Sequence, residues 1–169
     1  TLVWLDHIRP NPYQPRSVLN LNKVEAIARS IAADRLLQPP MARKKAADCF
    51  ELAFGDTRFN SFLFLRGQPR EWFEQNGYPI RDYSAMPLIV EALSDEDMYR
   101  YAVSENSHRE DISAIDEARA MKRAMDEFRY NSRQVGELFG KSDSTVRGTL
   151  RLLELPVAVQ DMVSSGELS

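Results

Sequence analysis

The segment from Ser132 to Pro156 constrains the fold of this chain more than any other, because its pattern fits two short helices joined by a tight turn. A serine that can cap a helix precedes apolar residues at helical spacing. Gly140 follows them and adopts the positive φ of a tight turn at little cost. Ser142 can cap the second helix, which ends before the proline. The sequence therefore predicts a helix-turn-helix over residues 132–155.

The second of these helices has one apolar side and one polar side. Val146, Leu150 and Leu153 share the side that we expect to face inward. The opposite side carries groups that can bond phosphates and base edges in a major groove. The residues expected to contact DNA are Gln134, Lys141, Ser142, Ser144, Thr145, Arg147 and Arg151. Because acidic residues nearly balance the basic ones, an ordinary helical hairpin with a solvated face is the alternative.

Upstream of this segment, strand and helix patterns are mixed. Strands are predicted at residues 2–5, 41–45, 50–54 and 87–92, and helices from Asn22, Arg58, Ser94 and Ser113. The first of these helices begins with a capping-box pattern, since Glu25 follows Asn22 by three positions. We therefore predict an α+β chain, with a small mixed α/β domain at 1–93, an irregular insertion at about 67–84 and an all-α domain at 94–169.

Composition limits the classes of function. With 43% hydrophobic and 28% charged residues and a net charge of −3, the chain is neither a disordered tail nor a bulk polycation. Any DNA binding must therefore come from a local patch. Cys49 is the single cysteine, which excludes an internal disulfide and fits a reducing cytoplasm. No apolar run approaches the roughly 18 residues of a membrane span.

Two polar motifs form a candidate anion site. Arg58 follows a strand, a glycine and a turn at the opening of a helix, where free N–H groups and a bidentate guanidinium favour phosphate. Arg109 can approach from a second helix end, near Glu105 and Asn106, whose oxygens suit Mg²⁺. Residues 14–16 add a third polar cluster. Taken separately, a helix cap and an i,i+4 ion pair explain these residues equally well.

Taken in order, the motifs resemble the ParB family of chromosome and plasmid partition proteins. They are PNPYQPR (10–16), SI and LLQP (30–31 and 36–39), GDTR (55–58), ENSHREDI (105–112), IDEA (115–118), GKS (140–142), LRLLELP (150–156) and GELS (166–169). The resemblance implies an α/β nucleotide-binding domain of the ParB/sulfiredoxin type, followed by the helix-turn-helix domain. It covers nearly the whole chain apart from the insertion.

The family resemblance also implies a mechanism. CTP with Mg²⁺ closes two subunits into a clamp that slides along DNA, a specific centromere-like site stimulates loading, and slow CTP hydrolysis accompanies release. A ParA-type ATPase is the usual partner, and the protein is cytoplasmic and nucleoid-associated. The family's C-terminal dimerisation region is expected to be absent from this sequence.

Several residues of this chain match the family's functional positions. Arg58 and Arg109 correspond to phosphate contacts, within a loop that includes Gly55, Asp56 and Thr57. By the same resemblance, Glu105 and Asn106 are expected to bind the metal ion, and Glu105 is also expected to assist hydrolysis. The remaining expected nucleotide contacts are Gln14, Arg16 and Gln38, the last of them near the base.

The sequence departs from the family pattern at three positions. Thr57 replaces one arginine of the phosphate loop, and losing such a charge-assisted bond costs about 1.5–3 kcal/mol. Arg35 replaces a glycine, at a cost on the order of 1 kcal/mol if its backbone is left-handed. Asp143 stands where many members place a basic or neutral residue that faces DNA. These departures favour a divergent plasmid, phage or mobile-element protein.

Two other functions compete with this interpretation. ATP-dependent reduction of a sulfinic acid, the sulfiredoxin activity, needs a cysteine in the phosphate loop, where this chain has Asp56 and Thr57. A DNA-binding regulator without productive nucleotide chemistry is the second. Thr57 supports the regulator, and the intact motif at 105–109 argues against it. A nuclease lacks evidence, because no metal cluster gathers around either histidine in the sequence.

Overall fold

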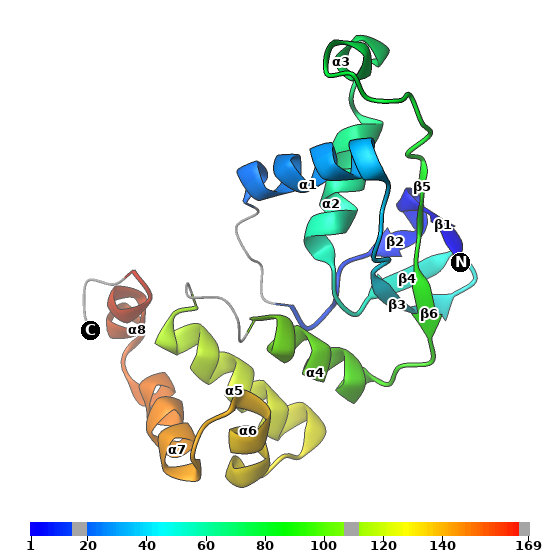
Figure 1. The fold of residues 1–169 in the computed structure, drawn as a ribbon. Helices are drawn as coiled ribbons and strands as arrows, with labels where there is room; N and C mark the ends of the chain where they lie inside the picture. Colours follow the sequence, from blue (N-terminus) through cyan, green and yellow to red (C-terminus); the bar gives the residue numbers. More distant parts are fainter. Residues whose placement is uncertain (15–19, 107–111, 166–169) are drawn as a thin grey trace. The chain divides into compact units, whose positions relative to one another are not determined.

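The computed structural model describes residues 1–14, 20–106 and 112–165, which form two compact units, Thr1–Met98 and Tyr99–Ser169 (Figure 1). The first unit contains β1 (Leu2–Trp4), β2 (Ile8–Arg9), α1 (Leu21–Asp34), β3 (Met41–Ala46), β4 (Cys49–Leu52), α2 (Asp56–Arg66), α3 (Arg70–Gln75), β5 (Ala85–Pro87) and β6 (Ile89–Glu91). The unit boundary falls within α4 (Asp95–Asn106). The second unit continues with α5 (Ala114–Phe128), α6 (Ser132–Phe139), α7 (Asp143–Arg151) and α8 (Val157–Ser164). The predicted α+β class, a mixed unit followed by a helical one, is confirmed.

The strands form two small sheets. One has the order β2-β4-β3-β6, with β4 and β3 antiparallel and both outer pairs parallel. The other pairs β1 with β5 in antiparallel fashion. The single strand predicted at 87–92 is wrong, because the chain changes partners at Leu88. The Leu88 N–H donates to the carbonyl of Thr1 at 2.7 Å, whereas the next N–H, of Ile89, donates to Pro40 at 2.9 Å.

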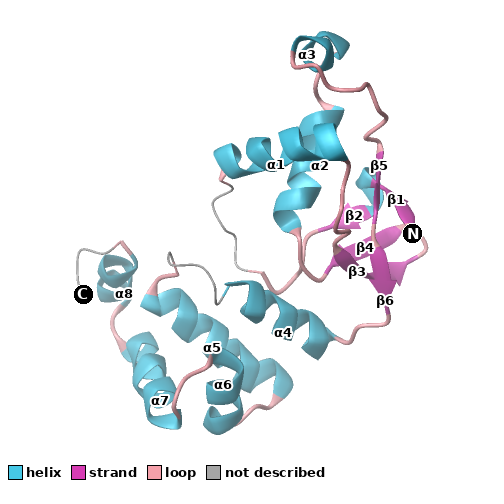
Figure 2. Cartoon of the chain, in the orientation of Figure 1, coloured by secondary structure: helices cyan, strands magenta, loops and turns pink. Residues whose placement is uncertain are grey.

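Helices α1 and α2 pack against each other and supply much of the first unit's core (Figure 2). Ala28, Ile31 and Phe62 are among the buried side chains that the helical spacing places on the inner faces. A buried hydroxyl joins the two helices, since Ser61 Oγ lies 2.9 Å from the carbonyl of Val24. This hydrogen bond satisfies the buried hydroxyl and joins the middle of α2 to the first turns of α1.

Two predicted helix starts are wrong by one or two residues. The N-cap of α1 is Asn20, not Asn22, because the Asn20 side chain accepts from the Lys23 N–H at 3.0 Å. The N-cap of α6 is Asn131, not Ser132, and it forms a reciprocal capping box with Gln134. In both places several polar residues adjoin the helix, and only the backbone path decides which side chain reaches the free N–H groups.

The segment at 67–84 is more regular than the sequence predicted. It contains α3 and adds aromatic side chains to the core. The ring of Phe73 stacks on Tyr83 with centroids 5.8 Å apart, and Tyr83 meets Phe62 edge-on at 5.7 Å. Both Phe73 and Tyr83 are buried. The segment is therefore fastened to α2 rather than standing apart from the core.

In the second unit, α5 provides the central apolar face. Ile115, Ala118, Met121 and Ala124 are fully buried, at the three-residue spacing of one helix face. The hydroxyl of Tyr99 donates to the carbonyl of Ala120 at 2.5 Å, and burial raises the pKa of this tyrosine above its ordinary value. No helix within the described residues is long and apolar enough to cross a membrane.

Arg35, directly after α1, has a strained backbone. Its φ is 67° and its ψ is 177°, a region that is essentially restricted to glycine. A side chain there costs about 1–3 kcal/mol. The positive φ expected from the family's glycine is therefore present, although ψ is extended rather than left-handed helical.

Replacing Arg35 by glycine should raise the free energy of unfolding. The relief of strain exceeds the roughly 0.5–1 kcal/mol of added chain entropy that glycine costs, which leaves a gain of about 1 kcal/mol. Urea denaturation followed by circular dichroism measures it. Arg35→Ala is the control, because it removes the same charged group but keeps the Cβ atom. An equal gain in both variants would assign the effect to the side chain rather than to the backbone.

Candidate functional site

The turn before α2 has the geometry of an anion-binding helix start. Gly55 is the N-cap of this helix, with φ 98° and ψ 27°. A Cβ atom on Gly55 would lie 2.8 Å from Cβ of Pro40, so both the conformation and the space require glycine. The first N–H groups of an α-helix point out of its N-terminus and carry the partial positive charge of the helix dipole, although the Arg58 N–H here is bonded to the Gly55 carbonyl at 3.0 Å. This turn can therefore receive a phosphate.

Arg58 connects this turn to the loop between α1 and β3. Its Nη2 atom lies 3.3 Å from Oε1 of Gln38, which is exposed. The fold thus brings together three of the predicted nucleotide residues, Gln38, Gly55 and Arg58. Asp56 and Thr57 are half-buried on the same turn, and burial raises the pKa of the Asp56 carboxyl.

Asn11 is a site residue to which the sequence analysis gave no role. Its Nδ2 atom donates to the carbonyls of Ala53 and Met98, both at 2.9 Å, and its Oδ1 accepts from the Tyr13 N–H at 2.9 Å. The Gln14 N–H donates to the Asn11 carbonyl at 3.2 Å. Asn11 therefore holds the loop that carries Gln14 beside the end of β4. The turn at 55–58, the candidate phosphate turn, follows directly along the chain. Its position between two prolines indicated a turn, but not its burial.

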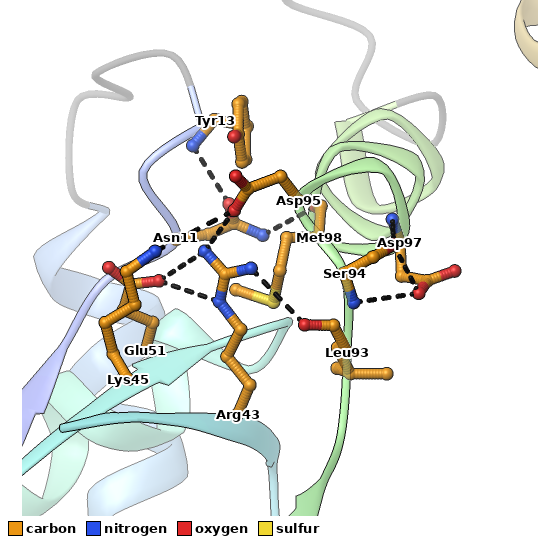
Figure 3. A network of polar contacts seen from close by, with 10 residues as sticks. All are labelled: Asn11, Tyr13, Arg43, Lys45, Glu51, Leu93, Ser94, Asp95, Asp97 and Met98. Atoms are coloured by element: carbon orange, nitrogen blue, oxygen red, sulfur yellow. Dashed lines mark hydrogen bonds and ion pairs between the residues drawn. The ribbon is translucent and has the colours of Figure 1, made fainter. Parts of the chain in front are cut away.

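A buried ion cluster fixes the first turn of α4 (Figure 3). The Arg43 side chain, only 7% exposed, places Nη2 2.7 Å from Glu51 Oε2 and 2.6 Å from Asp95 Oδ1. Its Nη1 donates to the carbonyl of Leu93 at 3.3 Å. The hydrogen bond from Arg43 lowers the pKa of Asp95. Strands β3 and β4 and the start of α4 thus share one buried cation.

The predicted metal-side residues lie in the second unit. Glu105 and Asn106 end α4, and the Glu105 side chain is half-buried. The predicted residues Arg16 and Arg109 lie outside the described residues. Within the described ranges, no group of three or more His, Cys, Asp or Glu side chains could hold a metal ion. A Mg²⁺ that keeps phosphate and water ligands needs only one or two protein oxygens, so Glu105 and Asn106 stay the predicted metal ligands.

Helices α6 and α7 form the predicted helix-turn-helix. Gly140 joins them with φ 65°. Gly136 permits their close approach, because a Cβ atom there would lie 2.5 Å from the carbonyl oxygen of Lys141. Val135 and Val146 are fully buried between the helices and α5. Gly136 is the residue that the sequence analysis missed, since a glycine within a helix has no local signal for close packing.

The polar residues predicted to contact DNA lie on the surface of this motif. Ser144, Thr145, Arg147 and Arg151 of α7 are exposed. Ser142, also exposed, caps α7 by accepting from the Thr145 N–H. The hydroxyls of Ser144 and Thr145 each lie 2.8 Å from Ser142 Oγ. The face presents donors and acceptors at the N-terminal turn of α7, where the helix dipole favours phosphate.

The remaining groups of this face are paired within the unit. Lys141 Nζ lies 3.2 Å from Glu117, Arg147 forms an ion pair with Asp143, and Gln134 belongs to the capping box. A hydrogen bond from Ser132, and secondly the one from Arg147, lowers the pKa of Asp143. On binding, DNA phosphates would therefore have to replace the carboxylate partners of Lys141 and Arg147.

Comparisons with known proteins match two parts of the chain to two domain families. The family model for the ParB N-terminal domain matches residues 1–107, and that for the ParB HTH domain matches residues 110–169. A nucleoid occlusion protein of Listeria monocytogenes is 30% identical over 165 residues, which cover 98% of this chain and 52% of the relative. The chain thus spans about half the length of the curated relatives that it matches.

Solved structures give a consistent result. The C-terminally truncated chromosome-partitioning protein ParB from Caulobacter crescentus, complexed to the centromeric parS site, aligns with a TM-score of 0.64 and 26% identity. The alignment covers 100% of this chain and 80% of that one. A structure of the Caulobacter protein complexed with CTP-gamma-S is 27% identical, covers 100% of this chain and 86% of that one, and has a TM-score of only 0.45.

The Arg43 cluster predicts a pH-dependent effect of Asp95→Asn. Because the pKa of Asp95 is lowered in the folded state, its contribution is present above the unfolded pKa and is lost as the pH falls through the folded value. The variant should therefore lose about 1 kcal/mol or less of unfolding free energy at pH 7, and the loss should shrink at acid pH. Urea titrations at several pH values measure it.

Asp48→Asn is the control for this experiment, since Asp48 is an exposed carboxylate of the same unit, 3.9 Å from His7. It should change stability little at any pH. A deficit of Asp95→Asn that stays constant down to strongly acid pH would contradict the pairing with Arg43.

Proposed function

The chain belongs to the ParB family, and on this premise we propose that it is a DNA-binding partition protein whose hold on DNA is switched by CTP. In this proposal it recognises a centromere-like site and, as a pair of subunits, closes into a clamp around DNA. It serves the segregation of a chromosome, plasmid or mobile element, with a ParA-type ATPase as partner. The Listeria relative is named for nucleoid occlusion, and the Caulobacter protein for chromosome partitioning.

The arrangement of α6, Gly140 and α7 is the observation that carries the proposal. It leaves one side of α7 exposed, with hydroxyl and guanidinium groups along it. Such a helix fits the major groove, where arginine reads guanine edges and serine or threonine bonds either base edges or phosphate. The similar Caulobacter protein was solved with its parS site, which supports a specific DNA target here. Arg147 and Arg151 are the proposed base and phosphate contacts.

The phosphate turn supports the nucleotide half of the proposal. Gly55 begins α2 with a positive φ, so that the helix N-terminus opens at this turn, and Arg58 adds a bidentate donor at the same place. Gln38 lies on the loop proposed to face the base. We assign Gln14, Arg16, Asp56, Thr57 and Arg109 to the rest of the nucleotide site.

Mg²⁺ would supply charge neutralisation between the phosphates, with Glu105 and Asn106 as its protein ligands. In the proposal Glu105 also accepts a proton from the attacking water, which makes the chain a slow CTPase. We propose CTP rather than another nucleotide because of the family to which the chain belongs, and not because of a base contact in the structure. Slow hydrolysis fits a switch better than an enzyme of metabolism, since the bound state must last long enough to be useful.

A DNA-binding regulator of the same fold, without productive hydrolysis, is the second candidate. The observation that favours it is the phosphate turn itself, where Thr57 takes the place of an arginine and the neighbouring Asp56 carboxylate opposes phosphate when ionised. Nucleotide binding distinguishes the two functions directly.

Arg58→Ala should weaken CTP binding by roughly tenfold to a hundredfold, because a charge-assisted hydrogen bond contributes about 1.5–3 kcal/mol. Calorimetry with CTP, ATP, GTP and UTP in the presence of Mg²⁺ measures both affinity and base selectivity. Arg66→Ala is the matched control, since Arg66 ends the same helix and pairs with Asp6 at 2.9 Å. Unchanged affinity in Arg58→Ala would remove this residue from the site, and no binding in the parent would favour the regulator.

Arg147→Ala should weaken specific DNA binding by about 1–3 kcal/mol, because a base contact and its charge are lost. The target duplex is first selected from a random pool, and binding is then measured over a range of salt concentrations. Arg133→Ala serves as the control, since Arg133 of α6 is an exposed cation outside the proposed contact face. Equal effects of the two variants on every sequence would show that α7 is not the recognition helix.

A further inference from the structure

The segment at 67–84 reaches the C-terminal end of α1 through Arg81. The Nη1 atom of Arg81 lies 2.7 Å from the carbonyl oxygen of Ala32 and 3.5 Å from that of Ile31. Its Nη2 atom lies 3.5 Å from the carbonyl oxygen of Ala33. One guanidinium therefore contacts three consecutive carbonyls, the last of them two residues before Arg35.

These carbonyls are the groups that an α-helix cannot satisfy by itself. Arg35 N–H donates to only one of them, that of Ile31, at 2.9 Å. The structure describes every residue in the last turn of α1, and none of them has a basic side chain that could offset the negative end of the helix dipole. Arg81 supplies both the missing donors and the missing positive charge, from a position 49 residues along the chain from Ala32.

Arg81 is itself held firmly. The next two residues form a turn in which the Asp82 side chain accepts from the Ser84 N–H at 2.8 Å. Tyr83 between them is buried and stacks on Phe73 of α3. The guanidinium is thus presented from a rigid part of the segment, so the contact with α1 costs little further ordering.

The end of α1 leads directly into the proposed nucleotide site. Arg35 has the strained backbone described above, and such a conformation persists only where the surroundings over-determine it. Three residues later, Gln38 bonds Arg58 at 3.3 Å. Pro40 then packs where a Cβ atom of Gly55 would lie. The position of the helix end therefore sets the positions of Gln38 and Pro40 against the phosphate turn.

We propose that Arg81 is a positioning residue for the nucleotide site: by clasping the end of α1 it holds the loop at 35–40 in the conformation that places Gln38 beside Arg58. The inference rests on the proposed nucleotide binding and deepens it. It gives the segment at 67–84 a role in ligand affinity, exerted without contact with the ligand.

Arg29 offers a matched control, because it fastens the same segment to the same helix at a different place. Its guanidinium lies 5.5 Å from the Trp72 ring, and its Nη1 donates to Asn76 Oδ1 at 2.8 Å. These contacts lie in the middle of α1 and do not involve the terminal carbonyls. Removing Arg29 weakens the attachment of the segment without releasing the loop.

The experiment compares Arg81→Ala, Arg81→Gln and Arg29→Ala with the parent 169-residue chain. Calorimetry with CTP and Mg²⁺ gives the affinity, and hydrogen exchange in the absence of nucleotide gives the protection of the amides of Leu36, Leu37 and Gln38. Both Arg81 variants should exchange these amides faster, and Arg81→Ala should bind CTP about fivefold to tenfold more weakly. Arg29→Ala should match the parent in both measurements, even if its thermal stability falls as far.

Two results would overturn the proposal. Equal CTP affinity in the Arg81 variants and the parent shows that the contact serves stability alone, and equal losses in Arg29→Ala and Arg81→Ala show that the helix end has no special part. If the parent binds no nucleotide, the proposed function fails separately. Exchange at 36–38 then decides whether Arg81 holds the loop: faster exchange supports the positioning role and unchanged exchange refutes it.

Discussion

The buried guanidinium of Arg43 is the interaction on which the first unit depends. A charge removed from water costs several kcal/mol unless partners compensate it, and here Glu51, Asp95 and the carbonyl of Leu93 compensate it together. These partners come from β4 and from the start of α4. The cluster thereby fixes the strand that leads to the turn at Gly55 against the first turn of α4. Asn11 reinforces the arrangement by bonding carbonyls of both segments.

The candidate nucleotide site is built on loops, and each loop is held by a rigid element. Pro40 approaches so closely that only glycine fits at position 55, and Arg58 bonds Gln38 of the same loop. That loop begins with Arg35, whose backbone is strained. In our proposal, the contacts of Arg81 with the end of α1 hold this loop from outside the site.

The candidate DNA face shows a different use of charge. The chain is acidic overall, and the Arg147 and Lys141 side chains are paired with carboxylates of their own unit. A DNA phosphate that binds Lys141 or Arg147 has to displace one of these carboxylates, which lowers the affinity for DNA of arbitrary sequence. In the proposed complex, base edges that accept from Arg147 and donate to Asp143 compensate for the lost pair, which favours specific over general binding.

The class of fold, the helix-turn-helix with its Gly140 turn and Ser142 cap, and the glycine turn before α2 could be predicted from the sequence, because helical spacing, capping and glycine conformation are local properties. The same patterns misplaced the caps of α1 and α6 and gave no role to the segment at 67–84. The contacts of Asn11, Arg43 and Arg81 became visible only in the folded chain. Asn11 bonds a carbonyl 87 residues away, whereas a periodic pattern records only near neighbours.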